Sequence, residues 1–315
     1  MNDALRKTLP GVLDRPYRTI RLEWNPEFSM LCARMRVRPI QCFSLAALAE
    51  LQQVFVDINA NPGLVRHTVI ASDVAGVFNF GGDLSLFVLL ARARDIDSLR
   101  LYARRCLGLI WWLENAADQG VHTIALVQGD VLGGGLESVL FHHTVIMERG
   151  SQGGFPEILF NLFPGMGGWN LALRRAGHAV ASEMVLSGKV YTADQMHQRG
   201  LVDYVTDDGT GEASLERIVR AMEPRFRGTI AALKARRVAA PISYESLEQI
   251  VDQWAVTALG LSNRDIRLME FRARAQLRKF GDSGNGAVEE IKRLELDSAW
   301  GFERTGTSAW GALVA

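Results

Sequence analysis

Alternation of apolar and polar residues marks the first elements of the chain. Residues 19–24 (TIRLEW) and 30–35 (MLCARM) alternate with a period of two, so we expect two short β-strands there. Ser44 precedes apolar residues spaced three and four apart up to residue 59, which predicts a helix capped by the Ser44 side chain. Residues 65–71 are rich in β-branched side chains and indicate a buried strand.

Strand and helix patterns continue to alternate further along the chain. We expect a helix over 96–114, a strand over 122–128, a helix that begins after three glycines at 133–135, and a short strand over 145–147. Strand–loop–helix units recur without a fixed sequence period, which argues against a solenoid of repeats. The pattern therefore predicts an α/β fold.

The pattern changes after Asp203. Residues 206–211 are polar and turn-forming, and the region that follows is almost entirely of helical pattern. We predict an α/β core over residues 1–215 and a helical C-terminal region over 216–280. Residues 281–315 contain scattered glycines and serines, so we expect a partly disordered tail there.

Composition limits the classes of function. The 315 residues are 48% hydrophobic and 22% charged, which is a globular composition. Lys plus Arg and Asp plus Glu each total 35, so no net charge favours nucleic acid or an anionic membrane as a partner. No apolar run approaches the roughly 18 residues of a spanning helix, and the first residues lack the apolar stretch of a secretory signal. We therefore expect a cytoplasmic protein without nucleic-acid or membrane partners.

The cysteines and paired histidines give no sign of a metal site. Cys32, Cys42 and Cys106 lack a CxxC partner, so reduced, partly buried thiols are the favoured interpretation and a catalytic cysteine is a minor alternative. His142 and His143 are adjacent and point in different directions on a helix, so they make a poor metal pair. We interpret them as structural groups or as groups that support the site.

Gly133, Gly134 and Gly135 lie between a predicted strand and a predicted helix. Without a Cβ they let a ligand lie against the main chain, and the first N–H groups of the helix stay unpaired. Those donors, with the helix dipole, suit a developing oxyanion. A tight strand-to-helix turn explains three glycines alone equally well. A phosphate loop is disfavoured because no Gly-Lys-Ser/Thr follows.

Two glutamates accompany bare stretches of backbone. Glu137 lies one turn inside the predicted helix among apolar neighbours, where a buried carboxyl suits a general acid or base. Glu157 follows Pro156, which fixes the local φ. An exposed surface glutamate and a helix-start glutamate are the ordinary explanations for each one alone. Upstream, Gly81 and Gly82 supply another place where a ligand could approach main chain closely.

Two further segments carry weaker signals. Residues 164–169 (PGMGGW) form a second glycine-rich turn, in which Met166 and Trp169 are candidates to line an acyl pocket, although core packing explains either residue alone. Five Arg and Lys residues fall between 225 and 237. A solvated helix face is the ordinary interpretation of such a cluster, and contact with an acidic carrier protein is the sharper one.

Taken together, residues 19–205 resemble the enoyl-CoA hydratase/isomerase (crotonase) superfamily. The segments YTAD at 191–194 and RGLVD at 199–203 are typical of its last core unit. The resemblance implies a crotonase-like spiral of ββα units and an assembly built from trimers.

The resemblance also implies roles for particular residues. The main-chain N–H groups of Gly82 and Gly134 are expected to hold a thioester carbonyl, with the backbone of Gly81 and Gly133 beside the substrate. Glu137 and Glu157, the latter twenty residues further on, are expected to be the catalytic pair. Glu157 takes a proton from C2 and Glu137 protonates the departing 3-hydroxyl, or the two roles are reversed.

Four segments are similar to the diffusible signal factor synthases, bacterial enzymes that make cis-2-unsaturated fatty acids for quorum sensing: 77–84 (VFNFGGDL), 132–135 (LGGG), 154–158 (GFPEI) and 161–168 (NLFPGMGG). This similarity implies dehydration of a 3-hydroxyacyl group on acyl carrier protein and hydrolysis of the thioester to the free acid. It implies a fatty acyl thioester as substrate, acyl carrier protein as partner and no cofactor. Binding to a sensor kinase could coexist with catalysis.

The chain departs from the general family pattern in two places. CoA-using relatives often have a basic residue just before the oxyanion segment, where this chain has Ala75-Gly76-Val77, and this favours a carrier-bound substrate. Gly82 stands where alanine is usual, which keeps the amide and loosens the backbone. An enoyl-CoA hydratase or isomerase is the nearest alternative function. A non-catalytic interaction protein is disfavoured because both glutamates are present.

Overall fold

The computed structural model describes residues 15–279, so the tail predicted over 281–315 lies outside the described residues. The larger sheet is mixed: its first two strands are antiparallel and the other pairs are parallel. Its order is β1 (Ile20–Asn25), β2 (Met30–Met35), β3 (His67–Ser72), β5 (His122–Val127), β7 (Thr144–Glu148) and β10 (Tyr204–Thr206).

A second sheet of four short strands was not expected from the sequence. Its order is β4 (Gly76–Asn79), β6 (Gly129–Leu132), β8 (Gln152–Gly154) and β9 (Val190–Thr192). These strands have three or four residues each, and glycine occupies one or two positions in three of them. Such segments are too short to show an alternating pattern, and glycine weakens the signal further.

Three strands of the larger sheet are each followed by a short strand of the second sheet and then by helix. β3 and β4 lead to α2 (Leu84–Ala93) and α3 (Ile96–Asn115), β5 and β6 lead to α4 (Gly134–Phe141), and β7 and β8 lead to the 3₁₀ turn η2 (Pro156–Phe160) and α5 (Gly168–Ser187). This succession confirms the expected crotonase-like spiral of ββα units. It also places the ends of β4, β6 and β8 side by side, because these three strands are neighbours.

The first helix shows how local sequence produces these elements. Ser44 caps α1 (Leu45–Ala60) by accepting a hydrogen bond from the N–H of Ala47 at 3.2 Å, as predicted. The apolar residues at helical spacing, including Leu48 and Leu51, are fully buried. Burial of such a stripe supplies most of the stability of a helix of this length.

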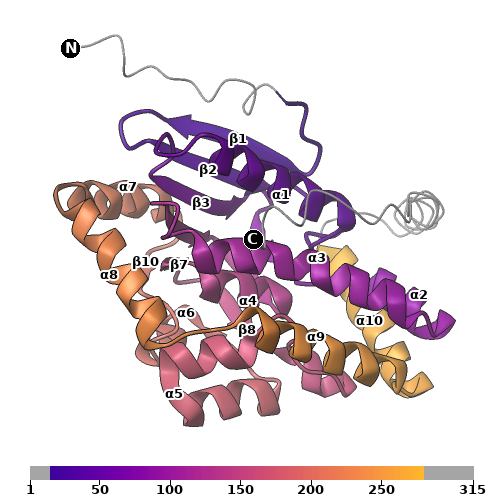
Figure 1. Ribbon diagram of the computed structural model, residues 1–315. Coiled ribbons are helices and arrows are strands. Elements are labelled where there is room, and N and C mark those ends of the chain that lie inside the picture. The colour runs from indigo at the N-terminus through magenta and orange to yellow at the C-terminus, as the bar shows by residue number, and fades with distance from the viewer. Residues whose placement is uncertain (1–14, 280–315) are drawn as a thin grey trace.

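The C-terminal part is helical, as expected, and its helices pack on different parts of the core. α7 (Gly211–Met222) covers the larger sheet, where Leu215, Ile218 and Val219 join a cluster with strand residues. The remaining helices are α6 (Ala193–Gln198), α8 (Phe226–Ala239), α9 (Tyr244–Leu259) and α10 (Asn263–Lys279). α9 packs against α3 and α10 against α2, at the side of the molecule away from α7 (Figure 1).

Within residues 15–279, no helix combines the length and the apolar character needed to cross a membrane.

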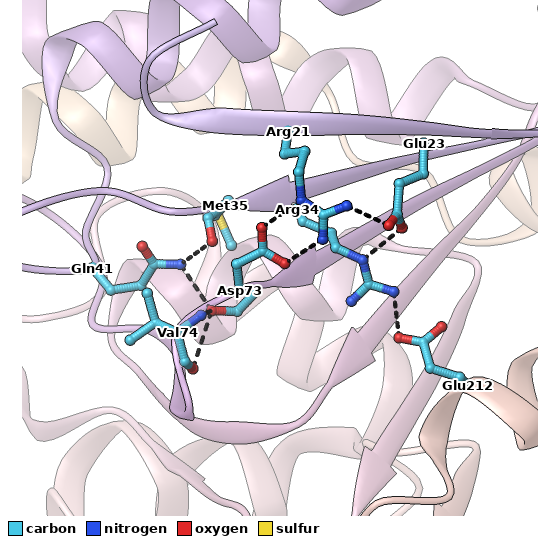
Figure 2. Close-up of polar contacts among 9 residues, drawn as sticks. Arg21, Glu23, Arg34, Met35, Gln41, Asp73, Val74 and Glu212 are labelled. Atoms are coloured by element: carbon cyan, nitrogen blue, oxygen red, sulfur yellow. Dashed lines mark hydrogen bonds and ion pairs between the residues drawn. The ribbon is translucent and has the colours of Figure 1, made fainter.

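Gln41 ties the segment before α1 to the neighbouring strands. Its fully buried amide donates to the carbonyl of Met35 at 3.0 Å and to Ser72 Oγ at 2.9 Å (Figure 2). Its side-chain oxygen accepts from the N–H of Val37, and its backbone carbonyl accepts from Phe80 N at 2.8 Å. A buried amide with every group paired fixes backbone position strongly. Gln41 thus holds the chain that leaves β4.

Ion pairs cross the outer face of the same strands. Arg21 of β1 pairs with Asp73 at 2.8 Å, and Arg34 of β2 pairs with Glu23 at 2.7 Å and also contacts Glu212 of α7 (Figure 2). Most of these side chains are substantially exposed. Surface pairs of this kind stabilise a fold by no more than about 1 kcal/mol each, so the sheet depends on its apolar core instead.

Candidate active site

A largely apolar pocket opens where the ends of β4, β6 and β8 meet the helices α2, α3, α4, α9 and α10. It holds about 820 Å³ of empty space, including space that is open to solvent. Six residues singled out in the sequence line it together: Gly82, Gly133, Gly134, Glu137, Glu157 and Met166. Segments far apart in the sequence therefore meet at one site, as the prediction of a single active site requires.

The backbones of the two glycine segments lie directly against each other. Gly81 has a φ of 89°, and a methyl group added there would lie 2.7 Å from the N of Gly134 and 3.0 Å from the O of Leu132. A methyl group added at Gly134 would lie 3.5 Å from the N of Gly82. Glycine is required at Gly81 both by its left-handed conformation and by this contact. Gly81 itself is not among the residues that line the pocket, but its backbone packs against that of the lining residue Gly134.

The amides of Gly82 and Gly134 are available to a ligand. Gly134 is the first residue of α4, so its N–H has no acceptor one turn earlier in the helix. Among residues 15–279, no protein acceptor is found for the N–H of Gly82. The carbonyl of Gly81 accepts from Phe43 N at 2.8 Å, which fixes the plane of the peptide that carries the Gly82 N–H. Two fixed donors at a helix N-terminus can stabilise an oxyanion.

The glycine at position 82 has a local cause. A methyl group added there would lie 2.4 Å from Cζ of Phe87, whose ring also lines the pocket. The space of an alanine side chain is therefore filled by Phe87, one turn into α2. The departure from the family's usual alanine is matched by an aromatic ring in the pocket wall.

Glu137 is anchored by backbone. It lies in the first turn of α4, a helix whose residues are all buried, and only 1% of its surface is exposed. Its Oε1 accepts hydrogen bonds from the N–H groups of Met166 and Gly168 at 2.8 and 2.7 Å. Burial raises the pKa of Glu137 to about 7, and the two backbone donors lower it in part.

The carboxyl of Glu157 has fewer hydrogen-bond partners than that of Glu137. It lies in η2, and its Oε1 would be 2.5 Å from a methyl group added at Gly133, so the carboxyl rests against bare backbone. Its Oε2 is buried without a hydrogen-bond partner among the described residues. Burial, together with the nearby charge of Glu137, raises the pKa of Glu157 to about 8. A buried oxygen without a partner inside a pocket is free to exchange a proton with a ligand or water.

The two carboxyls titrate as a coupled pair. Because the pKa values are raised to about 7 and about 8, neither carboxyl is fully ionised at neutral pH. One carboxylate can therefore accept a proton while the other carboxyl donates one. This combination suits a reaction that removes a proton and protonates a leaving group in the same site.

The contribution of Glu157 to the stability of the protein should fall as pH rises from about 4.5 to about 8. The folded pKa of Glu157 lies above the ordinary value of 4.5, so unfolding releases its proton within this window. The stabilisation is fully present below about pH 4.5 and is lost as pH rises through about 8, with a slope of about 1.4 kcal/mol per pH unit for one proton. Urea unfolding of the wild type and of Glu157→Gln across this range measures the effect. A stability difference that does not change with pH would contradict the raised pKa.

Trp169 does not line this pocket. It is the second residue of α5 and packs, partly buried, against the main core. Met166, three residues earlier, does line the pocket, and a methyl group on Gly134 would lie 2.6 Å from its Cε. The turn at Gly167, with a φ of 100°, separates the two side chains.

Several lining residues were not found from the sequence. Trp254 of α9 lies edge to face with Phe87 at 4.9 Å between ring centroids and closes one wall. Arg272 and Gln276 of α10 lie in the lining as well. In the sequence, Trp254 is one of a regular series of apolar helix positions, so nothing distinguishes it from core.

We assign no catalytic part to the cysteines, the paired histidines or the basic cluster. All three cysteines are free and buried, and burial raises the pKa of Cys106, which lines the pocket, to about 12. His142 and His143 are buried and hydrogen-bonded to backbone. Among residues 15–279, no group of three His, Cys, Asp or Glu residues is placed to hold a metal ion. The basic cluster at 225–237 lies mostly on exposed positions of α8, away from the pocket.

Comparisons with known proteins agree with this geometry. Residues 31–253 match the family model for enoyl-CoA hydratase/isomerase. The chain is 36% identical over 122 residues to 2,3-dehydroadipyl-CoA hydratase of Escherichia coli, covering 39% of this chain and 47% of that enzyme. The chain thus matches about half of the length of that relative, and about a quarter of the longer fatty acid oxidation complex subunits it also matches.

Solved structures share the fold. An enoyl-CoA hydratase/isomerase from Xanthobacter autotrophicus has a TM-score of 0.67 at 20% identity, covering 84% of this chain and 96% of that one. Pseudomonas aeruginosa DspI has a TM-score of 0.61 at 24% identity, covering 75% of this chain and 88% of that one. Since the family model spans well over half of the residues, the chain belongs to the enoyl-CoA hydratase/isomerase (crotonase) family.

Proposed function

We propose that the protein dehydrates a 3-hydroxyacyl group carried on acyl carrier protein to the cis-2-enoyl thioester and then hydrolyses the thioester. The product is a free cis-2-unsaturated fatty acid that serves as a diffusible signal in quorum sensing. One observation carries the proposal: two carboxyls with raised pKa values and two backbone amides line a single apolar pocket. The four segments similar to diffusible signal factor synthases support the specific product.

The dehydration uses every part of this constellation. The thioester oxygen accepts hydrogen bonds from the N–H groups of Gly82 and Gly134, and the ionised carboxyl of the pair takes the proton from C2. The resulting enolate expels the 3-hydroxyl, which leaves as water with the proton of the other carboxyl. The pair ends with the same number of protons that it began with. One fixed oxyanion donor is worth about 2.7–4 kcal/mol of barrier.

Hydrolysis follows in the same site. Water adds to the thioester carbon and gives a proton to an ionised carboxyl, and the same two amides hold the tetrahedral oxyanion. The carbon–sulfur bond then breaks, and the thiol of the carrier leaves with a proton. The unpartnered Oε2 of Glu157 supports this step, because it offers a free acceptor for the attacking water.

Acyl carrier protein is preferred over CoA because Ala75-Gly76-Val77 contains no cation before the oxyanion segment. A second candidate, enoyl-CoA hydratase or isomerase of fatty-acid metabolism, is favoured by the 36% identity to a CoA hydratase. Members of the family generally act as trimers or hexamers on acyl thioesters, and we extend this assembly to the present chain.

A product assay separates the two candidates. Purified protein is incubated with one 3-hydroxyacyl group on acyl carrier protein and, separately, on CoA, and the products are identified by mass spectrometry. Free cis-2-enoic acid is the expected product, and Glu157→Gln protein should form it at least about a hundredfold more slowly. Reversible interconversion with trans-2-enoyl-CoA, without free acid, would favour the hydratase. Absence of both products would contradict both candidates.

A further inference from the structure

α10 contributes to the wall of the pocket and is held near both ends. Near its beginning, Asp265 accepts a hydrogen bond at 2.8 Å from the side chain of Asn161, which caps η2. Near its end, Leu277 packs against the cluster that contains Phe80 and Leu132. The helix therefore connects the segment that carries Glu157 with the segment that leads to the oxyanion amides.

Between these fixed points, Arg272 and Gln276 turn towards the pocket. They lie one helical turn apart, on the same face of α10. Among the described residues that line the pocket, Arg272 is the one with a positive charge. It remains exposed to solvent, so it lies at the open side and not at the buried end.

Within residues 15–279, Arg272 has no carboxylate partner, although arginines of α2 and α3 do. Arg92 pairs with Glu270 at 2.6 Å, and Arg100 pairs with Asp252 at 3.0 Å. A guanidinium that is free of protein partners keeps all of its donors for a ligand. The two glutamates inside the pocket repel an anionic ligand when ionised, and a cation at the mouth offsets that repulsion.

We propose that Arg272 binds the phosphate of the 4′-phosphopantetheine arm that carries the acyl thioester, an inference that rests on the proposed function. The acyl chain occupies the apolar, buried part of the pocket, so the arm leaves through the open side beside Arg272. A guanidinium matches a phosphate with two parallel hydrogen bonds. The same phosphate is present in the phosphopantetheine arm of acyl carrier protein and of CoA. Arg272 therefore recognises the arm and does not distinguish the two carriers.

The test compares two thioesters of the same 3-hydroxyacyl group, one with phosphopantetheine and one with pantetheine, which lacks the phosphate. The wild type should have a kcat/KM about tenfold to a hundredfold higher for the phosphorylated arm, as a charge-assisted hydrogen bond pair allows. Arg272→Met should abolish this preference, chiefly by raising KM for the phosphopantetheine thioester towards the value for the pantetheine thioester. Arg274→Met, an exposed arginine two residues further on, should behave like the wild type.

Other outcomes overturn the assignment. An equal loss with both thioesters would mean that Arg272 acts on the position of α10. A loss with acyl-CoA alone, and none with acyl carrier protein or phosphopantetheine, would place the contact on the nucleotide. If the wild type turns over no 3-hydroxyacyl thioester, the proposed function fails. Calorimetry with non-reactive phosphopantetheine and pantetheine amides then still tests Arg272, and equal affinities would overturn its role.

Discussion

Glu157→Gln should lower the rate of product formation by about a hundredfold to ten-thousandfold, the range for a positioned general acid or base. Glutamine has the same shape but cannot exchange the proton that the reaction requires. The carboxyl is unsatisfied at Oε2 and carries a raised pKa in the free protein, so the substitution should also stabilise the fold at pH 8. Rate measurements under saturating substrate, with urea unfolding in parallel, test both effects.

Glu137→Gln should cause a loss of the same order without unfolding the protein. The amide oxygen of glutamine can still accept from the N–H groups of Met166 and Gly168, so the turn before α5 is retained. Glu148→Gln is a matched control, because Glu148 is also buried and accepts from the N–H of Gly211 but lies outside the pocket. Full activity in either pocket variant, or an equal loss in the control, would refute the catalytic pair.

Gly81→Ala should be the most damaging small substitution in the backbone of the site. The new methyl group would lie 2.7 Å from Gly134 N and 3.0 Å from Leu132 O, and backbone atoms cannot rotate away. Either oxyanion segment must shift, so we expect about a hundredfold to a thousandfold loss in kcat, the effect of losing one oxyanion donor. The free energy of unfolding should fall by about 1–3 kcal/mol from overpacking, in addition to the strain of a positive φ.

Gly76→Ala is the control for that experiment. Gly76 also has a positive φ, of 71°, and lies at the start of β4, but nothing lies within 4 Å of an added methyl group. It should show the conformational strain alone, about 1 kcal/mol, with near-normal kcat. Equal kcat for the two alanine variants would show that the contact between the oxyanion segments does not matter for catalysis.

Much of the secondary structure could be read from the sequence. The strands β1, β2, β3, β5 and β7 and the helices α1 and α3 follow from apolar periodicity, because one buried face imposes a period of two or of 3.6. The short strands of the second sheet and α2 could not be read in this way. Those strands are defined by their neighbours in space, since three or four residues with glycine have little preference of their own.

Some features of the candidate site could likewise be predicted from the sequence, and others could not. The spacing of Glu137 and Glu157 and the glycines around Gly82 and Gly134 could be recognised in the sequence as a family pattern. The sequence by itself therefore determined the family to which the chain belongs. It could not show that Met166 lines the pocket and Trp169 does not, because the turn at Gly167 points the two side chains to different places.

Only the tertiary structure decided the state of the glutamates and the shape of the entrance. The raised pKa values come from burial by residues distant in sequence, which remove water from both carboxyls. The contact of Gly81 with Gly134 comes from pairing of β4 with β6. Arg272 reaches the pocket because α10 packs against α2 and η2, which also line it. Solvation and long-range contact are properties of the packed chain, and no local pattern encodes them.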